Sequence, residues 1–356
     1  MAVLFLVNTP AQVMNAAVIA MTLYSHEECD AYFTENVSRE VESLARQNVF
    51  KAIYEIELVK DILQRKNILS RALVRIKNAL DIDLIIRSLP TSPLKYSRVF
   101  VSGVSLRNFE YYYAVKKINK RVSLSLYEEG IYEYYELGVK KSYFKILFSK
   151  IFFGQYYLNN CDSVYVHNPK FVQNIWSNIT VKEIPSYSSK KEIIKTLNLA
   201  FEYNKTQMEG IHNKFIVIEQ AFSNPSDEER QKELISLLVR YVGTDRVFIK
   251  MHPRSSSNKY KNVNIIDTRV PLEIIGMNED IFDNVYVSIV SSAIANFKLF
   301  LNKEPNVIML YELLGGIQNK NVNILFEHLK NSYNNGAFYT PKNITEFINQ
   351  IGHLNV

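Results

Sequence analysis

Short apolar runs alternate with longer amphipathic segments along almost the whole chain, and this alternation limits its fold more than any other feature. The first run, Val3–Val7, precedes a helical pattern over Ala11–Tyr24. Further strands are expected at Asp30–Thr34, Ala52–Leu58, Arg98–Ser102, Val122–Tyr127 and Ser163–His167, and helices at Ser38–Gln47, Asp61–Leu80, Leu106–Asn119 and Tyr143–Phe153. Strands that alternate with helices indicate βαβ units and a parallel sheet.

A second series of the same kind begins at the strand Phe215–Glu219, followed by a helix over Asp227–Tyr241 with Ser226 as its N-cap. Strands at Val247–Lys250, Val263–Ile266, Val285–Ile289 and Val307–Leu310 and helices at Pro271–Met277, Ala293–Leu301, Asn321–Lys330 and Thr345–Ile351 complete it. The polar segment 186–213 separates the two series, so we expect two Rossmann-like α/β domains, 1–195 and 196–356. Their parallel sheets are expected to face an interdomain cleft, with ligands at the carboxyl ends of the strands.

Composition excludes several classes of protein. Hydrophobic residues make up 47% and charged residues 22% of the 356, a balance typical of globular chains and not of disordered ones. Cys29 and Cys161 are the only cysteines, which excludes a disulfide framework or a cysteine zinc site and favours a reducing, cytoplasmic compartment. No uninterrupted apolar stretch reaches roughly 18 residues, so a membrane-spanning helix is not expected.

The charge is mildly basic, with 42 Lys and Arg against 36 Asp and Glu and a formal net charge of +6. These charges are scattered, so no nucleic-acid partner is expected, whereas an anionic ligand is allowed. Lys140, Lys141, Lys145 and Lys150 lie among the apolar side chains of 143–153. That segment fits either a peripheral contact with the inner face of an anionic membrane or a buried helix with a lysine-bearing outer face.

Several familiar catalytic motifs are absent from the sequence. It contains no GxGxxG, GxxxxGK[ST], HExxH or GxSxG, which weakens the dinucleotide, P-loop, zincin and hydrolase interpretations. No acidic pair stands in a convincing metal-binding loop, so we expect chemistry without a metal ion. Candidate residues are therefore sought at the ends of the predicted strands.

Two polar loops follow strands of the first series. Asn8, Thr9 and Gln12 follow the first strand and either face a ligand or form a plain strand-to-helix turn. Glu128 and Glu129 precede Gly130 at the end of the strand Val122–Tyr127. A carboxylate beside an apolar wall is a natural general base, although the alternative is a solvated acidic turn.

In the second series, His252 follows a strand and precedes Pro253 and Arg254. Histidine is the side chain best suited to donate a proton near neutral pH, and Arg254 with Lys250 adds the positive charge that suits a phosphate. A surface loop with an incidental histidine is the alternative. His167 also ends a strand and is a second-rank candidate.

A second polar group follows the strand Val285–Ile289. Ser291 and Ser292 open a helix there and either bind an anion with the free helix N–H groups or serve as ordinary caps. Glu273, at the start of another helix, either caps it or accepts hydrogen bonds from a ribose diol.

In this order, Glu128-Glu129-Gly130, His252-Pro253 and Ser291-Ser292 resemble the motifs of bacterial sialyltransferases of the lipooligosaccharide and capsule type, including the polysialyltransferases. The opening Asn-Thr-Pro-x-Gln run is also similar to the start of those families. The resemblance implies a GT-B fold, CMP-sialic acid as co-substrate without other cofactors, inversion at the anomeric carbon and no metal. Here the acidic motif reads Glu-Glu instead of the Asp-bearing form of some relatives, which leaves the choice of base open.

The resemblance also implies roles for individual residues. Glu129 would be the base with Glu128 as its neighbour, Asp227 would be the alternative base, and His252 would be the acid or the phosphate partner. Its donor-binding residues would be Pro253, Arg254, Glu273, Ser291 and Ser292, and its acceptor-facing residues Asn8, Thr9 and Gln12.

The function expected from sequence is thus an inverting, metal-independent sialyltransferase. Its acceptor would be a hydroxyl group of a galactose- or sialic acid-terminated bacterial surface glycan, with or without a lipid anchor. A GT-B transferase of another nucleotide sugar and a non-catalytic glycan- or nucleotide-binding protein are the alternatives. The sequence leaves open whether the chain forms a homodimer.

Overall fold

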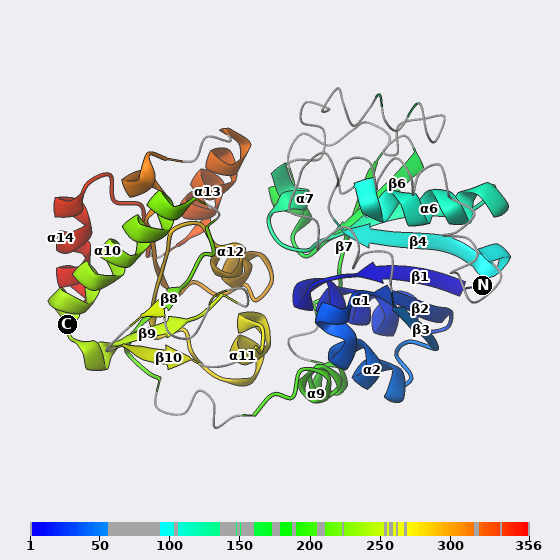
Figure 1. Ribbon diagram of the computed structural model, residues 1–356, viewed down its shortest axis with the longest axis horizontal. Helices are drawn as coiled ribbons and strands as arrows, with labels where there is room; N and C mark the ends of the chain where they lie inside the picture. The colour runs from blue at the N-terminus through cyan, green and yellow to red at the C-terminus, as the bar shows by residue number, and fades with distance from the viewer. Residues whose placement is uncertain are drawn as a thin grey trace. The chain divides into compact units, whose positions relative to one another are not determined.

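The chain, seen in a computed structural model, divides into two compact units, Met1–Ala200 and Phe201–Val356 (Figure 1). The structure describes residues 2–55, 93–102, 106–135, 160–172, 179–186, 190–204, 211–222, 224–252, 263–266, 269–316, 320–334 and 337–354, together with Leu147, Lys150, Ser255, Lys259 and Tyr260. The boundary expected after residue 195 falls within the last helix of the first unit, α9 (Lys191–Ala200).

The first unit contains a seven-stranded parallel sheet in the order β3-β2-β1-β4-β5-β6-β7. Its strands are β1 (Ala2–Val7), β2 (Glu28–Phe33), β3 (Ala52–Glu55), β4 (Tyr96–Ser102), β5 (Ser123–Tyr127), β6 (Cys161–Val166) and β7 (Thr180–Glu183). Its helices include α1 (Pro10–Thr22), α2 (Ser38–Arg46), α6 (Leu106–Ile118) and α7 (Tyr132–Tyr135). Helices α1, α2 and α9 lie on one side of the sheet and α6 lies on the other (Figure 1). The strand order reverses between β1 and β4, and ligands of such sheets bind at this switch point.

The central strand β1 is buried along its whole length, as expected for an apolar strand with helices on both faces. The Phe5 ring stacks on Phe100 of β4, with 4.8 Å between centroids. Helix α1 begins directly after β1, because Thr9 caps it by accepting a hydrogen bond from the Gln12 N–H and Pro10 occupies its first position. The polar loop between β1 and α1 is therefore held at the carboxyl edge of the sheet.

The second unit contains a six-stranded parallel sheet in the order β10-β9-β8-β11-β12-β13. Its strands are β8 (Phe215–Ile218), β9 (Val247–Lys250), β10 (Asn264–Ile266), β11 (Val285–Ser288), β12 (Asn306–Met309) and β13 (Phe338–Tyr339). Its helices are α10 (Pro225–Val242), α11 (Leu272–Asn278), α12 (Ser292–Leu299), α13 (Lys320–Ser332) and α14 (Ile344–Leu354). In this unit the strand order reverses between β8 and β11, so its switch point lies between the loops that follow these two strands.

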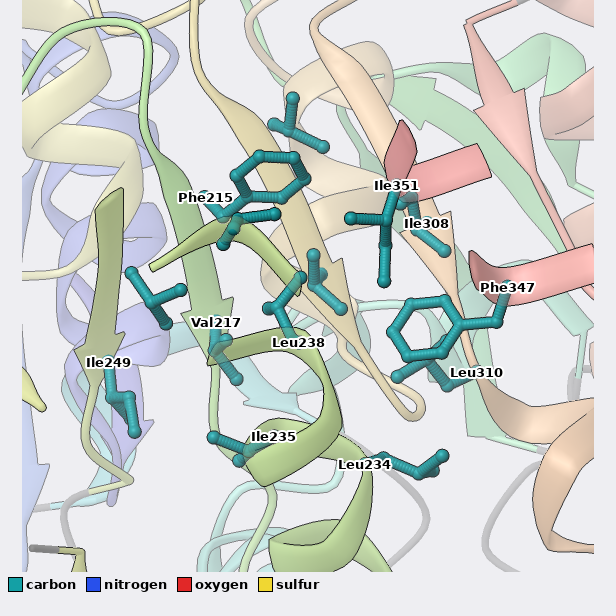
Figure 2. Packing of buried hydrophobic residues seen from close by; sticks show 14 of the residues in the cluster. Phe215, Val217, Leu234, Ile235, Leu238, Ile249, Ile308, Leu310, Phe347 and Ile351 are labelled. Carbon is teal, nitrogen blue, oxygen red and sulfur yellow. The ribbon is translucent and has the colours of Figure 1, made fainter. Parts of the chain in front are cut away.

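The core on one face of this second sheet joins the strands to α10 and α14. Figure 2 shows the side chains of Phe215, Val217, Ile249 and Ile308 from the strands, and of Leu310 directly after β12, packed with side chains from the two helices. The helical contribution comes from Leu234, Ile235, Leu238, Phe347 and Ile351. Helices α11 and α12 lie on the opposite side of the sheet (Figure 1).

The two predicted parallel sheets are confirmed, with local differences. Strand β7 was not expected, because three of its four residues are exposed and its sequence carries no apolar run. Helix α10 is capped by the Asn224 side chain, which accepts a hydrogen bond from the Ser226 N–H, so the prediction of Ser226 as the cap is wrong. The expected helix Asp61–Leu80 and, apart from residues 147 and 150, the expected helix Tyr143–Phe153 lie outside the described residues.

Most of the lysine-bearing segment lies outside the described residues, and the peripheral membrane contact stays a prediction. Lys140, Lys141 and Lys145 lie outside the described residues, and Lys150 is exposed. Within the part of the chain that the structure describes, no helix is both long and apolar enough to span a membrane.

Candidate active site

The Glu129 carboxylate lies at the switch point of the first sheet and accepts hydrogen bonds from side chains on three neighbouring segments. Thr9 Oγ1 donates to Oε1 at 3.0 Å, Gln12 Nε2 donates to Oε2 at 2.7 Å, and Ser102 Oγ donates to Oε2 at 3.3 Å. These donors come from the loop after β1, from α1 and from the end of β4. The structure thus brings three predicted residues, Thr9, Gln12 and Glu129, together and adds Ser102, which the sequence did not single out.

Gln12 has a fixed orientation in this group. Its side-chain oxygen accepts a hydrogen bond from the backbone N–H of Asn8 at 2.6 Å, so its amide nitrogen must be the atom that faces Glu129. Gln12 is buried, which makes both hydrogen bonds costly to lose. Gln12 therefore links the loop after β1 to the Glu129 carboxylate.

Glu128 differs sharply from its neighbour. Its side chain is 1% exposed, and its carboxylate accepts a hydrogen bond from the Tyr134 hydroxyl at 2.6 Å and from the His167 backbone N–H at 2.7 Å. Glu129 instead has polar side chains of the β1 loop and α1 as its partners, so one carboxylate faces the interior and the other faces the edge of the sheet. Of the two, Glu129 is the one available to a ligand.

The His167 ring is part of the same interior group. Its Nε2 lies 2.9 Å from Asn15 Oδ1, and Asn15 Nδ2 donates to the Glu128 carbonyl oxygen at 2.7 Å. Burial lowers the pKa of His167 to about 3, so the imidazole is neutral and its Nε2 carries the hydrogen that Asn15 accepts. This arrangement gives His167 a role in holding the Glu128 segment.

The pKa of His167 has a consequence for stability. An unfolded histidine has a pKa of about 6.5, so below that pH the unfolded chain binds a proton that the folded chain does not. The free energy of unfolding should therefore fall by about 2 kcal/mol more in the wild type than in His167→Gln between pH 7 and pH 5. Urea unfolding of both proteins at the two pH values measures this difference, and an equal loss in both would contradict it.

In the second unit, His252 follows β9 and its backbone is firmly held. Its N–H donates to Oε2 of the buried Glu219 at 2.8 Å, and its carbonyl oxygen accepts a hydrogen bond from the Ser255 N–H at 2.8 Å. The side chain is partly exposed at the carboxyl end of the sheet. The two residues after it, Pro253 and Arg254, lie outside the described residues.

Helix α12 begins at the switch point of the second sheet with an uncapped N-terminus. Ser291 has the extended backbone of an N-cap residue, with φ −124° and ψ 127°, but its side chain makes no capping hydrogen bond. Thr9 at α1 and Asn224 at α10 do cap their helices. Ser291 is partly exposed and Ser292 is exposed, which suits the predicted anion site better than the alternative of an ordinary cap.

Glu273 on α11 is fixed by a residue that the sequence did not indicate. Glu273 is 6% exposed, and its Oε1 accepts a hydrogen bond from Asn296 Nδ2 on α12 at 2.6 Å. Burial lowers the pKa of Lys250, at the end of β9, to about 8, while the charge of Glu273 acts in the opposite direction. The second unit therefore holds a carboxylate, an amine and an uncapped helix N-terminus on neighbouring elements.

Asp227, the alternative base, lies in the first turn of α10. Its Oδ2 accepts a hydrogen bond from Asn224 Nδ2 at 3.1 Å, and a carboxylate at this position is favoured by the helix dipole. A structural role thus accounts for Asp227 without any ligand. Within the described residues no group of three or more His, Cys, Asp or Glu could hold a metal ion, and the expectation of metal-free chemistry stays a prediction.

Comparison with solved structures shows which fold this is. An α/β-galactoside α-2,3-sialyltransferase from Photobacterium phosphoreum is 13% identical, with a TM-score of 0.53 over 95% of this chain and 98% of that one. A 2,6-sialyltransferase of Photobacterium sp. JT-ISH-224, solved with CMP and lactose, is 11% identical, with a TM-score of 0.54 over 95% and 78% of the two chains. The spinosyn forosaminyltransferase is 10% identical, with a TM-score of 0.54 over 100% and 94%. These likenesses confirm the predicted α/β, GT-B fold, which transferases of different sugars share.

Comparison of sequences identifies the family. An uncharacterized protein of Haemophilus influenzae is 26% identical over 176 residues, which is 47% of this chain and 56% of that relative, so the match spans about half of the relative's length. The model of the alpha-2,8-polysialyltransferase (POLYST) family matches residues 3–310, which include Glu129, His252 and Ser291. Because this match covers most of the chain and reaches into both of its sheets, the protein belongs to the alpha-2,8-polysialyltransferase family.

Proposed function

We propose that this protein is an inverting, metal-independent sialyltransferase. It moves sialic acid from CMP-sialic acid to a hydroxyl group of a galactose- or sialic acid-terminated bacterial surface glycan, of the lipooligosaccharide or capsule type. The observation that supports this most is the Glu129 carboxylate, held at a sheet switch point by Thr9, Gln12 and Ser102 in a member of the family.

Glu129 is the general base of the proposed reaction. The acceptor hydroxyl is a poor nucleophile until its proton is removed, and a positioned carboxylate takes that proton as the new bond forms. Because Thr9 and Gln12 are both bound to Glu129, they contribute by orienting the base. In this scheme Asn8, whose N–H binds Gln12, is the residue of the loop that contacts the acceptor.

The departing CMP is stabilised by the second unit. Its phosphate gains negative charge as the bond to the sugar breaks, so positive charge and N–H donors aimed at it lower the barrier. His252 donates a proton or a hydrogen bond to this phosphate, and Ser291 with the uncapped N-terminus of α12 binds its other oxygens. Lys250 adds positive charge nearby, and Glu273, oriented by Asn296, accepts hydrogen bonds from the ribose.

Attack by the acceptor on the face opposite the phosphate inverts the anomeric carbon in a single displacement. The acceptor oxygen forms its bond to that carbon while the bond to the phosphate oxygen breaks. The hydroxyl proton passes to Glu129, and the electron pair of the broken bond leaves with CMP. No step of this scheme requires a metal ion, because His252 and the helix N–H groups stabilise the leaving phosphate.

A turnover assay tests the proposal. The protein is incubated with CMP-sialic acid and galactose- or sialic acid-terminated oligosaccharides, with and without EDTA, and CMP release and product mass are followed. We expect acceptor-dependent CMP release, a sialylated product, and equal rates with and without the chelator. Absence of release with every acceptor and every sialic acid donor would contradict the proposal.

The preference of the protein for one nucleotide distinguishes transfer from CMP-sialic acid from transfer of a sugar from another nucleotide sugar. A ligand present at about 100 times its dissociation constant stabilises the folded protein by about 2.7 kcal/mol. We expect CMP to raise the melting temperature clearly and UDP at the same concentration to leave it nearly unchanged. A larger shift with UDP than with CMP would instead support a donor other than CMP-sialic acid.

A further inference from the structure

The buried carboxylate of Glu219 makes contacts that the proposed function does not use. Glu219 directly follows β8 and is 3% exposed. Its Oε2 accepts the His252 N–H at 2.8 Å, and its Oε1 pairs with Lys259 Nζ and accepts a hydrogen bond from the Tyr260 hydroxyl at 3.3 Å. Burial, followed by the charge of Glu219, raises the pKa of Tyr260, so that hydroxyl stays protonated and donates.

These contacts fix both ends of one segment. His252 opens the segment that leaves β9, and Lys259 and Tyr260 return to the same carboxylate seven and eight residues later. Helix α10 supports the arrangement through the buried Gln231, whose Nε2 donates to the Tyr260 hydroxyl at 3.3 Å and whose Oε1 accepts the Gln220 N–H at 3.0 Å. Glu219 therefore sets where the His252 backbone lies.

The first unit contains a closely similar arrangement. There the buried Glu128 follows β5 and accepts the N–H of His167, which follows the neighbouring strand β6, as well as the Tyr134 hydroxyl. In both units a buried glutamate after one strand thus holds the backbone of a histidine after the adjacent strand. The repetition indicates that fixing a histidine backbone is what these buried carboxylates do.

We propose that Glu219 is a positioning residue for the transfer reaction, and that it acts by holding the His252 N–H so that the imidazole is placed toward the leaving phosphate. This inference rests on the proposed function. Displacing a catalytic group by about 1 Å can cost about 10²-fold in rate, so a buried hydrogen bond that fixes its backbone has a measurable effect.

Substitution by glutamine provides the first test, because an amide cannot replace both sides of this carboxylate. An amide has one accepting and one donating end. If the amide oxygen accepts the His252 N–H, the amide NH₂ faces the Lys259 ammonium, and two donors oppose each other. If the amide oxygen faces Lys259, the NH₂ instead opposes the His252 N–H. We expect Glu219→Gln to lower kcat by at least about 10-fold. Adding Lys259→Met removes the conflict, so the double variant should recover to within about 3-fold of the wild type.

A matched second variant keeps the test independent of folding defects. Glu219→Leu with Lys259→Met also removes both buried charges, a change that is often tolerated, but it leaves the His252 N–H without an acceptor. We call this double variant Leu/Met, and the double variant Glu219→Gln with Lys259→Met we call Gln/Met. We expect kcat of Leu/Met to be at least about 10-fold below that of Gln/Met at a similar melting temperature. Equal kcat values in the two folded double variants would overturn the inference.

The effect of Glu219 on kcat must also depend on the His252 side chain. In a His252→Ala background, we expect the Leu/Met and Gln/Met variants to differ by less than about 2-fold, since residues that act through one another are not additive. A 10-fold difference that persists in this background would overturn the inference. The proposed function fails separately, if the wild type does not release CMP from CMP-sialic acid.

Discussion

Replacing Glu129 by Gln should lower kcat for sialic acid transfer by about 10²–10⁴-fold, the range typical for loss of a general base. The amide has nearly the same shape and can accept hydrogen bonds from some of the present donors, Thr9, Gln12 and Ser102, but it cannot take a proton from the acceptor hydroxyl. Steady-state kinetics of CMP release, with a melting curve to show that the variant folds, measure this effect. The KM for CMP-sialic acid should change little, because in the proposed scheme the second unit binds the donor.

Glu128→Gln is the matched control for this substitution. Its carboxylate accepts from Tyr134 and the His167 N–H in the interior, so the amide should lower the free energy of unfolding by about 1–3 kcal/mol. Its kcat should fall much less than that of Glu129→Gln. Asp227→Asn completes the comparison, and a loss at Asp227 that exceeds the loss at Glu129 would transfer the role of base to Asp227.

The second large effect is expected at His252. His252→Ala should lower kcat by about 10²–10⁴-fold, because the leaving phosphate then loses its proton donor or hydrogen-bond partner. The backbone contact with Glu219 does not depend on the side chain, so the variant should keep its fold. Kinetics of CMP release and the thermal shift with CMP measure activity and binding separately.

His252→Gln distinguishes the two roles left open for the imidazole. Glutamine can donate a hydrogen bond to a phosphate oxygen but cannot transfer a proton at neutral pH. An activity as low as that of the Ala variant would assign the role of acid to His252, and a recovery of about 10-fold or more would assign the role of phosphate partner. If both variants stayed within about 2-fold of the wild type, His252 would have no part in the reaction.

The sequence predicted the two sheets because most of their central strands carry unmistakable signals. Val3–Val7 and Phe215–Ile218 are apolar throughout, as buried parallel strands require, and polar side chains appear directly after them. Edge elements lack that signal. Strand β7 has the sequence TVKE with little burial, and its pairing with β6 depends on backbone hydrogen bonds that any sequence can make.

The candidate site was only partly predictable from the sequence, because its contacts join residues that are far apart along the chain. Thr9 and Glu129 are 120 residues apart, and their contact depends on β1, β4 and β5 lying side by side, an order that strand patterns do not determine. The same applies to the pair Glu273 and Asn296 on α11 and α12. Ser102 could have been found, because it is the last residue of a predicted strand next to the one that leads to Glu129.

The choice between adjacent acidic residues also needed the structure. Glu128 and Glu129 both follow the end of β5, and the sequence does not say which of them faces the interior. The Tyr134 hydroxyl and the His167 N–H bind the Glu128 carboxylate in the interior, and Asn15 binds the Glu128 carbonyl oxygen. Glu129 is left with polar partners at the edge of the sheet, where it is partly exposed.

A crystal structure with an unreactive analogue of CMP-sialic acid and a bound oligosaccharide acceptor would test most directly whether one carboxylate and one imidazole act on the same ligands. We expect a Glu129 oxygen within about 3.2 Å of the acceptor hydroxyl and a His252 nitrogen within about 3.2 Å of a phosphate oxygen, with that phosphate at Ser291. A complex in which CMP binds away from His252 and Ser291, or in which another carboxylate faces the acceptor, would contradict the account.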